Sequence, residues 1–298
     1  MEFWQLTVPT SPETSDGLTN FLWEQGALGV IEEESPTEPP RVRAFFPAAA
    51  ASTKLARAVA EYRASLRVLG FSVAAADAEI TPLLDGEWAS AWQRAFPPRE
   101  IGRRLVIVPP WECGAQPQLR IPVVIEPGRA FGTGQHGSTE GCLALLEDAL
   151  EAGRAWRSGT RALDIGTGSG ILAIAAMTLG VPAALAIDVD PDALAAARQN
   201  ADRNRCADRI AFALQGPDEL APSECFPLVL ANLLTHTHLA LAACYARLIA
   251  PGGVLVVGGI LADEEHQVAH ALGAQGLAPR RRVVIDDWSS LLLTAAGP

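Results

Sequence analysis

The amino-acid sequence predicts an α/β fold in two parts, a small ferredoxin-like α+β domain followed by a Rossmann-like domain with a mostly parallel sheet. Two patterns carry this prediction. The first eighty residues follow the order β-α-β-β-α-β, which is that of the split βαβ, or ferredoxin-like, arrangement. From residue 126 onwards, short apolar runs alternate with helical segments, as in a parallel sheet with helices on both faces.

Length and composition agree with two folded domains. At roughly 150 residues per domain, a chain of 298 residues suggests two. Hydrophobic residues make up 49% of the chain and charged residues 19%, which permits a large core and excludes bulk disorder.

The first domain contains two helical segments, and each is followed by a glycine, Gly26 or Gly70, which is a common helix stop. The second helix has an apolar face that includes Leu55, Val59 and Leu66. In order, we expect strands at residues 2–8, 28–31, 41–46 and 71–80, and helices at 12–25 and 52–69.

A connection rich in tryptophan and proline follows, with two expected strands at 104–108 and 121–125. Its aromatic residues, such as Trp88 and Trp92, have two interpretations that the sequence leaves open. In one interpretation they line the entrance to a substrate site, and in the other they pack one domain against the other. The chain then divides into a domain at 1–80, a connection at 81–125 and a domain at 126–298.

The second domain begins with a glycine-rich loop at 126–139 and then alternates strands with helices. We expect helices at 139–150, 171–179, 191–204, 235–249 and 262–272. We expect strands at 161–165, 183–187, 209–214, 228–231, 254–257, 281–285 and 291–294. The last two strands are separated only by a short turn at 286–288, so they should form an antiparallel hairpin.

The strongest motif is a glycine-rich turn that contains Gly166, Gly168 and Gly170, after an expected strand and before a helix. Glycines let backbone amides approach a ligand, and a helix N-terminus favours an anionic group. A dinucleotide fingerprint would place its third glycine at the sixth position, where Ile171 stands. The G-x-G-x-G form is instead typical of S-adenosylmethionine-dependent methyltransferases.

Two polar residues stand at strand ends that should share one edge of the sheet. Asp188 lies 22 residues after Gly166 and is placed to accept hydrogen bonds from ribose hydroxyls, whereas Asp190 should cap the next helix. Asn232 has both donor and acceptor atoms, which suits holding an amine near a cofactor. The alternative interpretation is that it is only a turn residue at the end of a strand. The leucines that follow Asn232 replace the Pro-Pro pair found in methyltransferases of bases or glutamine amides, which argues against that chemistry.

Charge, cysteines and histidines exclude several functions. With a net charge of −11, we expect no sequence-specific nucleic-acid binding, and a basic partner suits the chain better. The five cysteines form no CxxC pair, and His236 and His238 do not share one helical face, so we expect no metal site. No signal peptide or membrane span is recognisable, which predicts a cytoplasmic protein without a membrane partner.

The sequence resembles the ribosomal protein methyltransferases of the PrmA type, which modify large-subunit ribosomal protein L11. The resemblance runs nearly from end to end. It is carried by Trp4-Gln5-Leu6, residues 26–30, Trp88, Trp92, Phe96, Ile101-Gly102, Arg104-Leu105, Ala130-Phe131-Gly132-Thr133-Gly134, His136, Thr139, residues 171–175, Pro251-Gly252-Gly253, Gly259-Ile260-Leu261 and Asp287-Trp288.

The resemblance implies a class I methyltransferase domain that uses S-adenosylmethionine, and an N-terminal domain that grips the ribosomal protein. The residues expected to contact the cofactor are Thr139, Gly166, Gly168, Gly170, Asp188 and Asn232. The sequence departs from the family at Glu126, where aspartate is usual, and at 135–139, where Thr-His-Pro-Thr-Thr is usual. These departures leave the cofactor assignment intact but put the target protein, and how many amines are methylated, in question.

We therefore expect a monomeric enzyme that methylates amine nitrogens of L11, either lysine side chains or the N-terminal α-amine or both. Asn232 is the candidate for orienting the amine, and His136 is a second candidate that could relay a proton. The alternative is a protein-lysine methyltransferase of the same build with another protein substrate. A nicotinamide oxidoreductase and a non-catalytic binding module are rivals of other classes.

Overall fold

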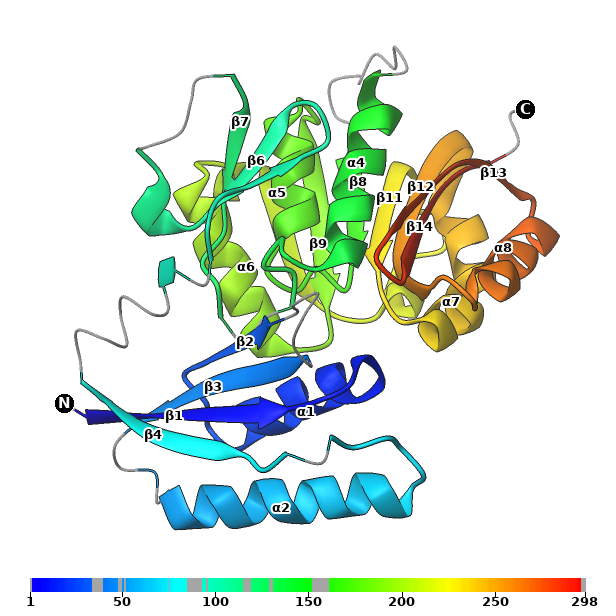
Figure 1. The fold of residues 1–298 in the computed structure, drawn as a ribbon. Helices are drawn as coiled ribbons and strands as arrows, with labels where there is room; N and C mark the ends of the chain where they lie inside the picture. The colour runs from blue at the N-terminus through cyan, green and yellow to red at the C-terminus, as the bar shows by residue number, and fades with distance from the viewer. Residues whose placement is uncertain are drawn as a thin grey trace. The chain divides into compact units, whose positions relative to one another are not determined.

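A computed structural model shows two compact units, Met1–Phe96 and Pro97–Pro298 (Figure 1). The expected connection at 81–125 is divided between them, because its first residues extend a strand of the first unit. Trp88, Trp92 and Ala130 lie outside the described residues. The structure describes residues 2–33, 40–47, 50, 52–74, 76–84, 93–94, 96–114, 119–128, 131–151 and 161–295.

The first unit has the predicted ferredoxin-like topology. Its sheet has the order β2-β3-β1-β4, and all neighbouring strands are antiparallel. Leu6 and Val8 of the central strand lie on one face, where they pack with Leu18 and Leu22 of the first helix. The elements are β1 (Glu2–Pro9), α1 (Pro12–Glu24), β2 (Gly29–Glu33), β3 (Arg41–Pro47), α2 (Ser52–Val68) and β4 (Glu79–Leu84).

The last strand of this sheet differs from the expected segment at 71–80. β4 begins only at Glu79, which pairs with Thr7 of β1. Before it, the carbonyl oxygens of Ala74 and Ala76 accept hydrogen bonds from the guanidinium of Arg63, at 2.5 and 2.7 Å. The prediction of a strand from residue 71 is wrong because backbone groups there bond to a side chain instead of a neighbouring strand.

The second unit has the predicted seven-stranded sheet, in the order β10-β9-β8-β11-β12-β14-β13. The pairs among β8 to β12 are parallel, and β14 is antiparallel to both of its neighbours, as expected for the hairpin. The strands are β8 (Arg161–Ile165), β9 (Ala183–Asp188), β10 (Ile210–Leu214), β11 (Phe226–Asn232), β12 (Ile249–Leu261), β13 (Leu277–Ile285) and β14 (Trp288–Ala295).

Helices cover both faces of this sheet (Figure 1). One core includes residues of α4, α5 and α6, and the other includes residues of α7 and α8. In the described ranges, no helix has the length and apolar composition that a bilayer span requires. The helices are α4 (Gly137–Glu151), α5 (Ile171–Thr178), α6 (Pro191–Arg203), α7 (Thr235–Leu248) and α8 (Glu265–Ala274).

Several elements of this unit have other bounds than expected. β13 begins at Leu277 instead of residue 281, and β14 begins at Trp288 instead of residue 291, because the two strands pair over their whole length. β12 has 13 residues, because its N-terminal end also pairs with Phe226 of β11, outside the apolar run at 254–257. α8 begins at Glu265 instead of residue 262, because the amide of Ala262 donates to the carbonyl of Asp287 across the end of the hairpin, at 2.9 Å.

A small three-stranded sheet packs with the α4–α6 core. It consists of β5 (Arg99–Ile101), β6 (Leu105–Val108) and β7 (Ile121–Val124), and β6 is antiparallel to β5 but parallel to β7. The sequence predicts the second and third strands. It does not predict β5, because three residues are too few to show an alternating pattern.

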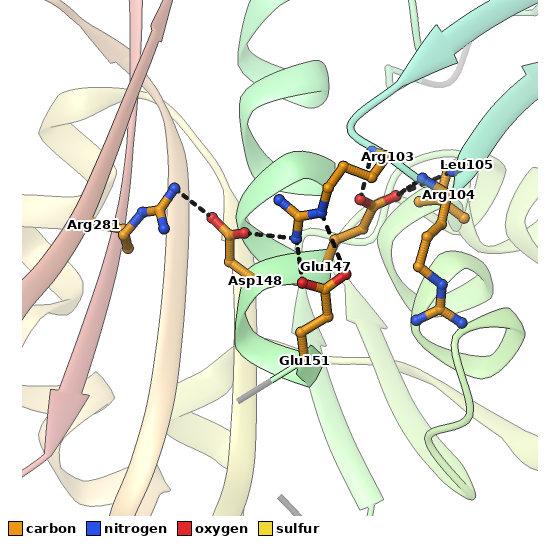
Figure 2. Close-up of polar contacts among 7 residues, drawn as sticks. All are labelled: Arg103, Arg104, Leu105, Glu147, Asp148, Glu151 and Arg281. Atoms are coloured by element: carbon orange, nitrogen blue, oxygen red, sulfur yellow. Dashed lines mark hydrogen bonds and ion pairs between the residues drawn. The ribbon is translucent and has the colours of Figure 1, made fainter. Parts of the chain in front are cut away.

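Glu147 of α4 ties this small sheet to the rest of the unit (Figure 2). Its buried carboxylate accepts backbone hydrogen bonds from Arg103 at 2.8 Å and from Arg104 and Leu105 at 3.0 Å. The turn between β5 and β6 therefore closes around one side chain. Arg103 also forms ion pairs with Asp148 and Glu151 on the same helix.

Replacing Glu147 with glutamine should lower the free energy of unfolding by about 1–3 kcal/mol, because the amide nitrogen cannot accept the bonds that one carboxylate oxygen accepts. Urea unfolding of the whole chain measures this change. The matched control is Glu151→Gln on the same helix, which removes only a partly exposed ion pair and should cost about 0–1 kcal/mol. Equal effects of the two substitutions would contradict the role given to Glu147.

Candidate active site

The glycine-rich turn lies between β8 and α5, at the carboxyl edge of the seven-stranded sheet. Gly166, Gly168 and Gly170 all have positive φ values. A Cβ atom on Gly168 would stand 2.6 Å from the carbonyl oxygen of Phe131, so no other residue fits there without a shift of the backbone. The turn therefore presents bare backbone at the start of a helix.

Asp188, at the end of β9, lies beside this turn. Its Oδ2 accepts a hydrogen bond from the amide of Gly168 at 2.9 Å, and its Oδ1 accepts one from the amide of Asp190 at 3.0 Å. The side chain of Asp190 in turn accepts from the amide of Asp192 and caps α6, as the sequence predicts. A carboxylate has more acceptor sites than these two bonds use, so Asp188 can also receive hydroxyl donors.

A second loop, at residues 131–134, lies against the glycine-rich turn. The amide of Ser169 donates to the carbonyl of Phe131 at 2.9 Å, and the Ser169 hydroxyl donates to the carbonyl of Gly132 at 2.6 Å. Asn200 of α6 donates to the carbonyl of Ser169 at 2.9 Å and accepts from the amide of Glu126 at 3.0 Å. One buried amide side chain thus joins the glycine-rich turn to the backbone of Glu126.

Asn232, at the end of β11, contacts Thr139 in the first turns of α4. Its Nδ2 donates to the Thr139 hydroxyl at 3.2 Å, and Thr139 is fully buried. The Oδ1 of Asn232 is also buried and has no hydrogen-bond partner in the described part of the chain. Two residues that were each expected to contact the cofactor therefore meet in space, 93 residues apart in the chain, and one acceptor atom of Asn232 has no partner among the described residues.

Asp164 is a site residue to which the sequence reasoning assigned no role. It is the penultimate residue of β8 and is buried, and its Oδ2 accepts from the Thr167 hydroxyl at 2.7 Å and from the amide of Ala173 at 3.2 Å. Its Oδ1 is buried without a partner among the described residues. Burial raises the pKa of Asp164 to about 6, although its two hydrogen bonds act in the opposite direction. An acid within an otherwise apolar strand was the available signal.

The histidines take different places. His136 lies near the site, where Nδ1 is 2.8 Å from the Ser138 hydroxyl and the ring contacts Phe131 and Trp288. His238 is fully buried, and its ring nitrogens are 2.8 Å from the carbonyl oxygen of Gly258 and 2.9 Å from the Tyr245 hydroxyl. Burial lowers the pKa of His238 to about 4, so this imidazole is a neutral core group.

These groups give one edge of the sheet the features of a cofactor and acceptor site. The glycine-rich turn offers backbone amides, Asp188 offers a carboxylate, and Asp164 and Asn232 each offer an unpartnered buried oxygen. Leaving a buried acceptor unpaired costs about 1–3 kcal/mol, so a ligand with matching donors would recover that free energy. Within the described residues, no group of three or more histidines, cysteines or acids is arranged to hold a metal.

Comparison with known proteins gives consistent results. The family model described as ribosomal protein L11 methyltransferase (PrmA) matches residues 2–296. The L11 methyltransferase of Trichlorobacter lovleyi is 32% identical over 300 residues, which cover 97% of each chain. That of Geobacter metallireducens is 38% identical over 216 residues, which cover 72% of this chain and 69% of the other.

A solved structure is also similar. The crystal structure of ribosomal protein L11 methylase from Lactobacillus delbrueckii subsp. bulgaricus aligns with a TM-score of 0.58 and 29% sequence identity. The alignment covers 67% of this chain and 98% of that one.

Replacing Asp164 with asparagine should change how stability depends on pH. Folding raises the pKa of Asp164 from 3.8 to about 6. The contribution of this group to the free energy of unfolding is therefore highest below pH 4, where the carboxyl group is protonated in both states, and it falls as the pH rises from 4 to 6. The loss is at most about 3 kcal/mol, at about 1.4 kcal/mol for each pKa unit.

Urea unfolding of both proteins at several pH values between 4 and 8 tests this, because groups common to both cancel in the difference. The variant should gain stability relative to the native chain as the pH rises. Asp208→Asn, at an exposed position, serves as the control and should show a constant difference. A flat difference for Asp164→Asn would show that the carboxyl group is ionised in the folded protein throughout this range.

Proposed function

The chain belongs to the ribosomal protein L11 methyltransferase family, and on this premise we propose that it transfers methyl groups from S-adenosylmethionine to amine nitrogens of L11. The amines are lysine side chains or the N-terminal α-amine or both. The observation that carries the proposal is the buried Oδ1 of Asn232, held in place through Thr139 and left without a donor.

The residues present fit S-adenosylmethionine. The amides of the glycine-rich turn at the start of α5 suit its carboxylate, and Asp188 suits its ribose hydroxyls. Asp164 lies under the same turn with one free oxygen, which suits a cationic group. When bound, this cofactor supplies an activated methyl group on a sulfonium. The protein contributes orientation and exclusion of water.

Asn232 then acts on the acceptor amine. An amine attacks through its lone pair, so it must be neutral. A free α-amine has a pKa of about 7.7–8 and a lysine side chain one of about 10.4, so a lysine has to lose its proton in the site. The Oδ1 of Asn232 accepts an N–H bond from the neutral amine. That bond fixes the direction of the lone pair, and Thr139 prevents the amide from rotating.

The acidic chain, with a net charge of −11, suits a basic ribosomal protein. We further propose that the N-terminal unit recognises that protein, and that the enzyme is a cytoplasmic monomer. The test is incubation with purified L11 and S-adenosylmethionine, read by intact mass for steps of one methyl group. Labelling of another cellular protein, with L11 unchanged, would instead support a protein-lysine methyltransferase with a different substrate.

Asn232→Ala should lower the turnover number by about tenfold to a hundredfold, because the amine loses the acceptor that orients it. Intact-mass time courses at saturating L11 and cofactor measure the rate. Gln275→Ala, at an exposed position, is the control and should behave like the native enzyme. Near-native turnover of Asn232→Ala would remove this residue from the mechanism.

Asp188→Asn should weaken binding of S-adenosylmethionine by about tenfold to a hundredfold, because hydrogen bonds to a charged group contribute about 1.5–3 kcal/mol. Titration calorimetry gives the dissociation constant without any methyl transfer. Asp202→Asn, exposed on α6, is the matched acidic control. If both variants bind the cofactor like the native protein, Asp188 is not part of the ribose site.

A further inference from the structure

Two adjacent glycines of β12 lie against Asn232, the residue proposed to hold the amine. The pairing of β12 with β14 is irregular across Gly258 and Gly259. Gly259 has a φ of +77°, and a Cβ atom there would clash with the carbonyl oxygen of Leu233 and stand 3.0 Å from the Oδ1 of Asn232. The side chain of Asn232 therefore has the Thr139 hydroxyl on its Nδ2 side and the bare backbone of Gly259 on its Oδ1 side.

The carbonyl oxygen of Gly258 joins this part of β12 to the start of α7. It accepts a hydrogen bond from the amide of Leu233 at 3.0 Å, and the Nε2 of His238 lies 2.8 Å from it. Leu233 follows Asn232 directly, and Asn232 is itself paired with Gly258 in the parallel ladder of β11 and β12. One carbonyl group therefore fixes the corner between β11 and α7 at which Asn232 stands.

The two partners of the His238 ring assign its proton. A carbonyl oxygen can only accept, so Nε2 carries the proton and donates to Gly258. Because burial lowers the pKa of His238 to about 4, the ring is neutral and Nδ1 is an acceptor. Nδ1 lies 2.9 Å from the hydroxyl of Tyr245, and burial raises the pKa of that hydroxyl, which therefore keeps its proton and donates. The bonds run in one direction, from Tyr245 through His238 to Gly258.

Both side chains of this chain of bonds are fully buried, and Tyr245 belongs to the apolar core that includes residues of α7 and α8. Buried polar groups lower stability unless they are hydrogen-bonded, and an apolar pair of similar volume would fill the same space. Here the two polar groups together hold one backbone carbonyl, and that carbonyl borders Asn232. Their placement therefore suits the proposed reaction better than it suits packing.

We propose that His238 is a positioning residue for methyl transfer. Oriented by Tyr245, its Nε2–H holds the Gly258 carbonyl and thereby sets where the backbone of Gly259 borders the Oδ1 of Asn232. Because His238 is fully buried, it acts through Asn232 and not on the substrate. The inference rests on the proposed function, because Asn232 is the group that is positioned.

Two amide substitutions that differ in reach give the first test. In His238→Gln the side-chain nitrogen can occupy the position of Nε2 and keep the bond to Gly258, whereas in His238→Asn it ends near the position of Nδ1. His238→Asn should lower the turnover number with L11 by about tenfold, and His238→Gln should stay within about threefold of the native value. KM for L11 and the dissociation constant for S-adenosylmethionine should change by less than about threefold in both variants.

Leu248→Ala is the control that separates positioning from stability. Leu248 is fully buried in the same core, at the last residue of α7. Its truncation should lower the urea midpoint and leave the turnover number native. A native turnover number in His238→Asn would overturn the inference. So would a loss that His238→Gln shares in full, because the bond to Gly258 would then not be its cause.

The second test requires no methyl transfer. The side-chain amide signals of Asn232 are assigned by their absence in Asn232→Ala and followed by NMR in each variant. They should move further in His238→Asn than in His238→Gln. Both variants lack the imidazole ring, so the difference between them reports the bond to Gly258. Leu248→Ala should leave the signals in place.

Equal displacement of the Asn232 signals in the two amide variants would overturn the inference. If His238→Asn does not fold, Tyr245→Phe replaces it, because it removes only the hydroxyl that orients the ring. Unmoved Asn232 signals in that variant would then overturn the inference. If the signals move as expected but the native enzyme leaves L11 unmethylated, the proposed substrate is wrong and the link from His238 to Asn232 stands.

Discussion

The second unit depends on the bonds between the buried carboxylate of Glu147 and three successive backbone amides. They fix α4 against the small sheet. Because a helix is rigid, fixing one part of it positions its other residues. Thr139 then meets Asn232, and Gly137 meets the turn that precedes Trp288. One buried carboxylate on α4 therefore helps to position the small sheet relative to Asn232 and to the hairpin.

The sequence predicts the order of strands and helices in the second unit, because the alternation of short apolar runs with helical segments is a local signal. It fails where the deciding contact is distant or the segment is short. β5 has only three residues. β4 begins later than expected because Arg63 of α2 binds the backbone that precedes it. For the candidate site, the sequence predicts the positions of Asp188 and Asn232 at the ends of two strands, and the structure places them there. The aromatic contact of His136 with Trp288 joins residues far apart in the chain, and no spacing rule reveals it.

The buried side-chain oxygens of the second unit fall into two groups, those with hydrogen-bond partners and those without. Both carboxylate oxygens of Glu147 accept hydrogen bonds from the backbone, whereas Asp164 and Asn232 each have one buried oxygen without a partner among the described residues. The first kind stabilises the fold. The second kind costs stability and is what a binding site requires, because only unused acceptors can receive a ligand's donors. The contrast distinguishes Glu147, which stabilises the fold, from Asp164 and Asn232, which belong to the candidate site.

The position of β14 in the sheet affects how the chain folds during synthesis. β14 lies between β12 and β13 and pairs with both, yet it follows both in the chain. Until it emerges, the edge of β12 has no partner on that side, and an unpaired apolar edge invites association with other chains. The nascent chain therefore completes its large sheet only when this last strand has been made.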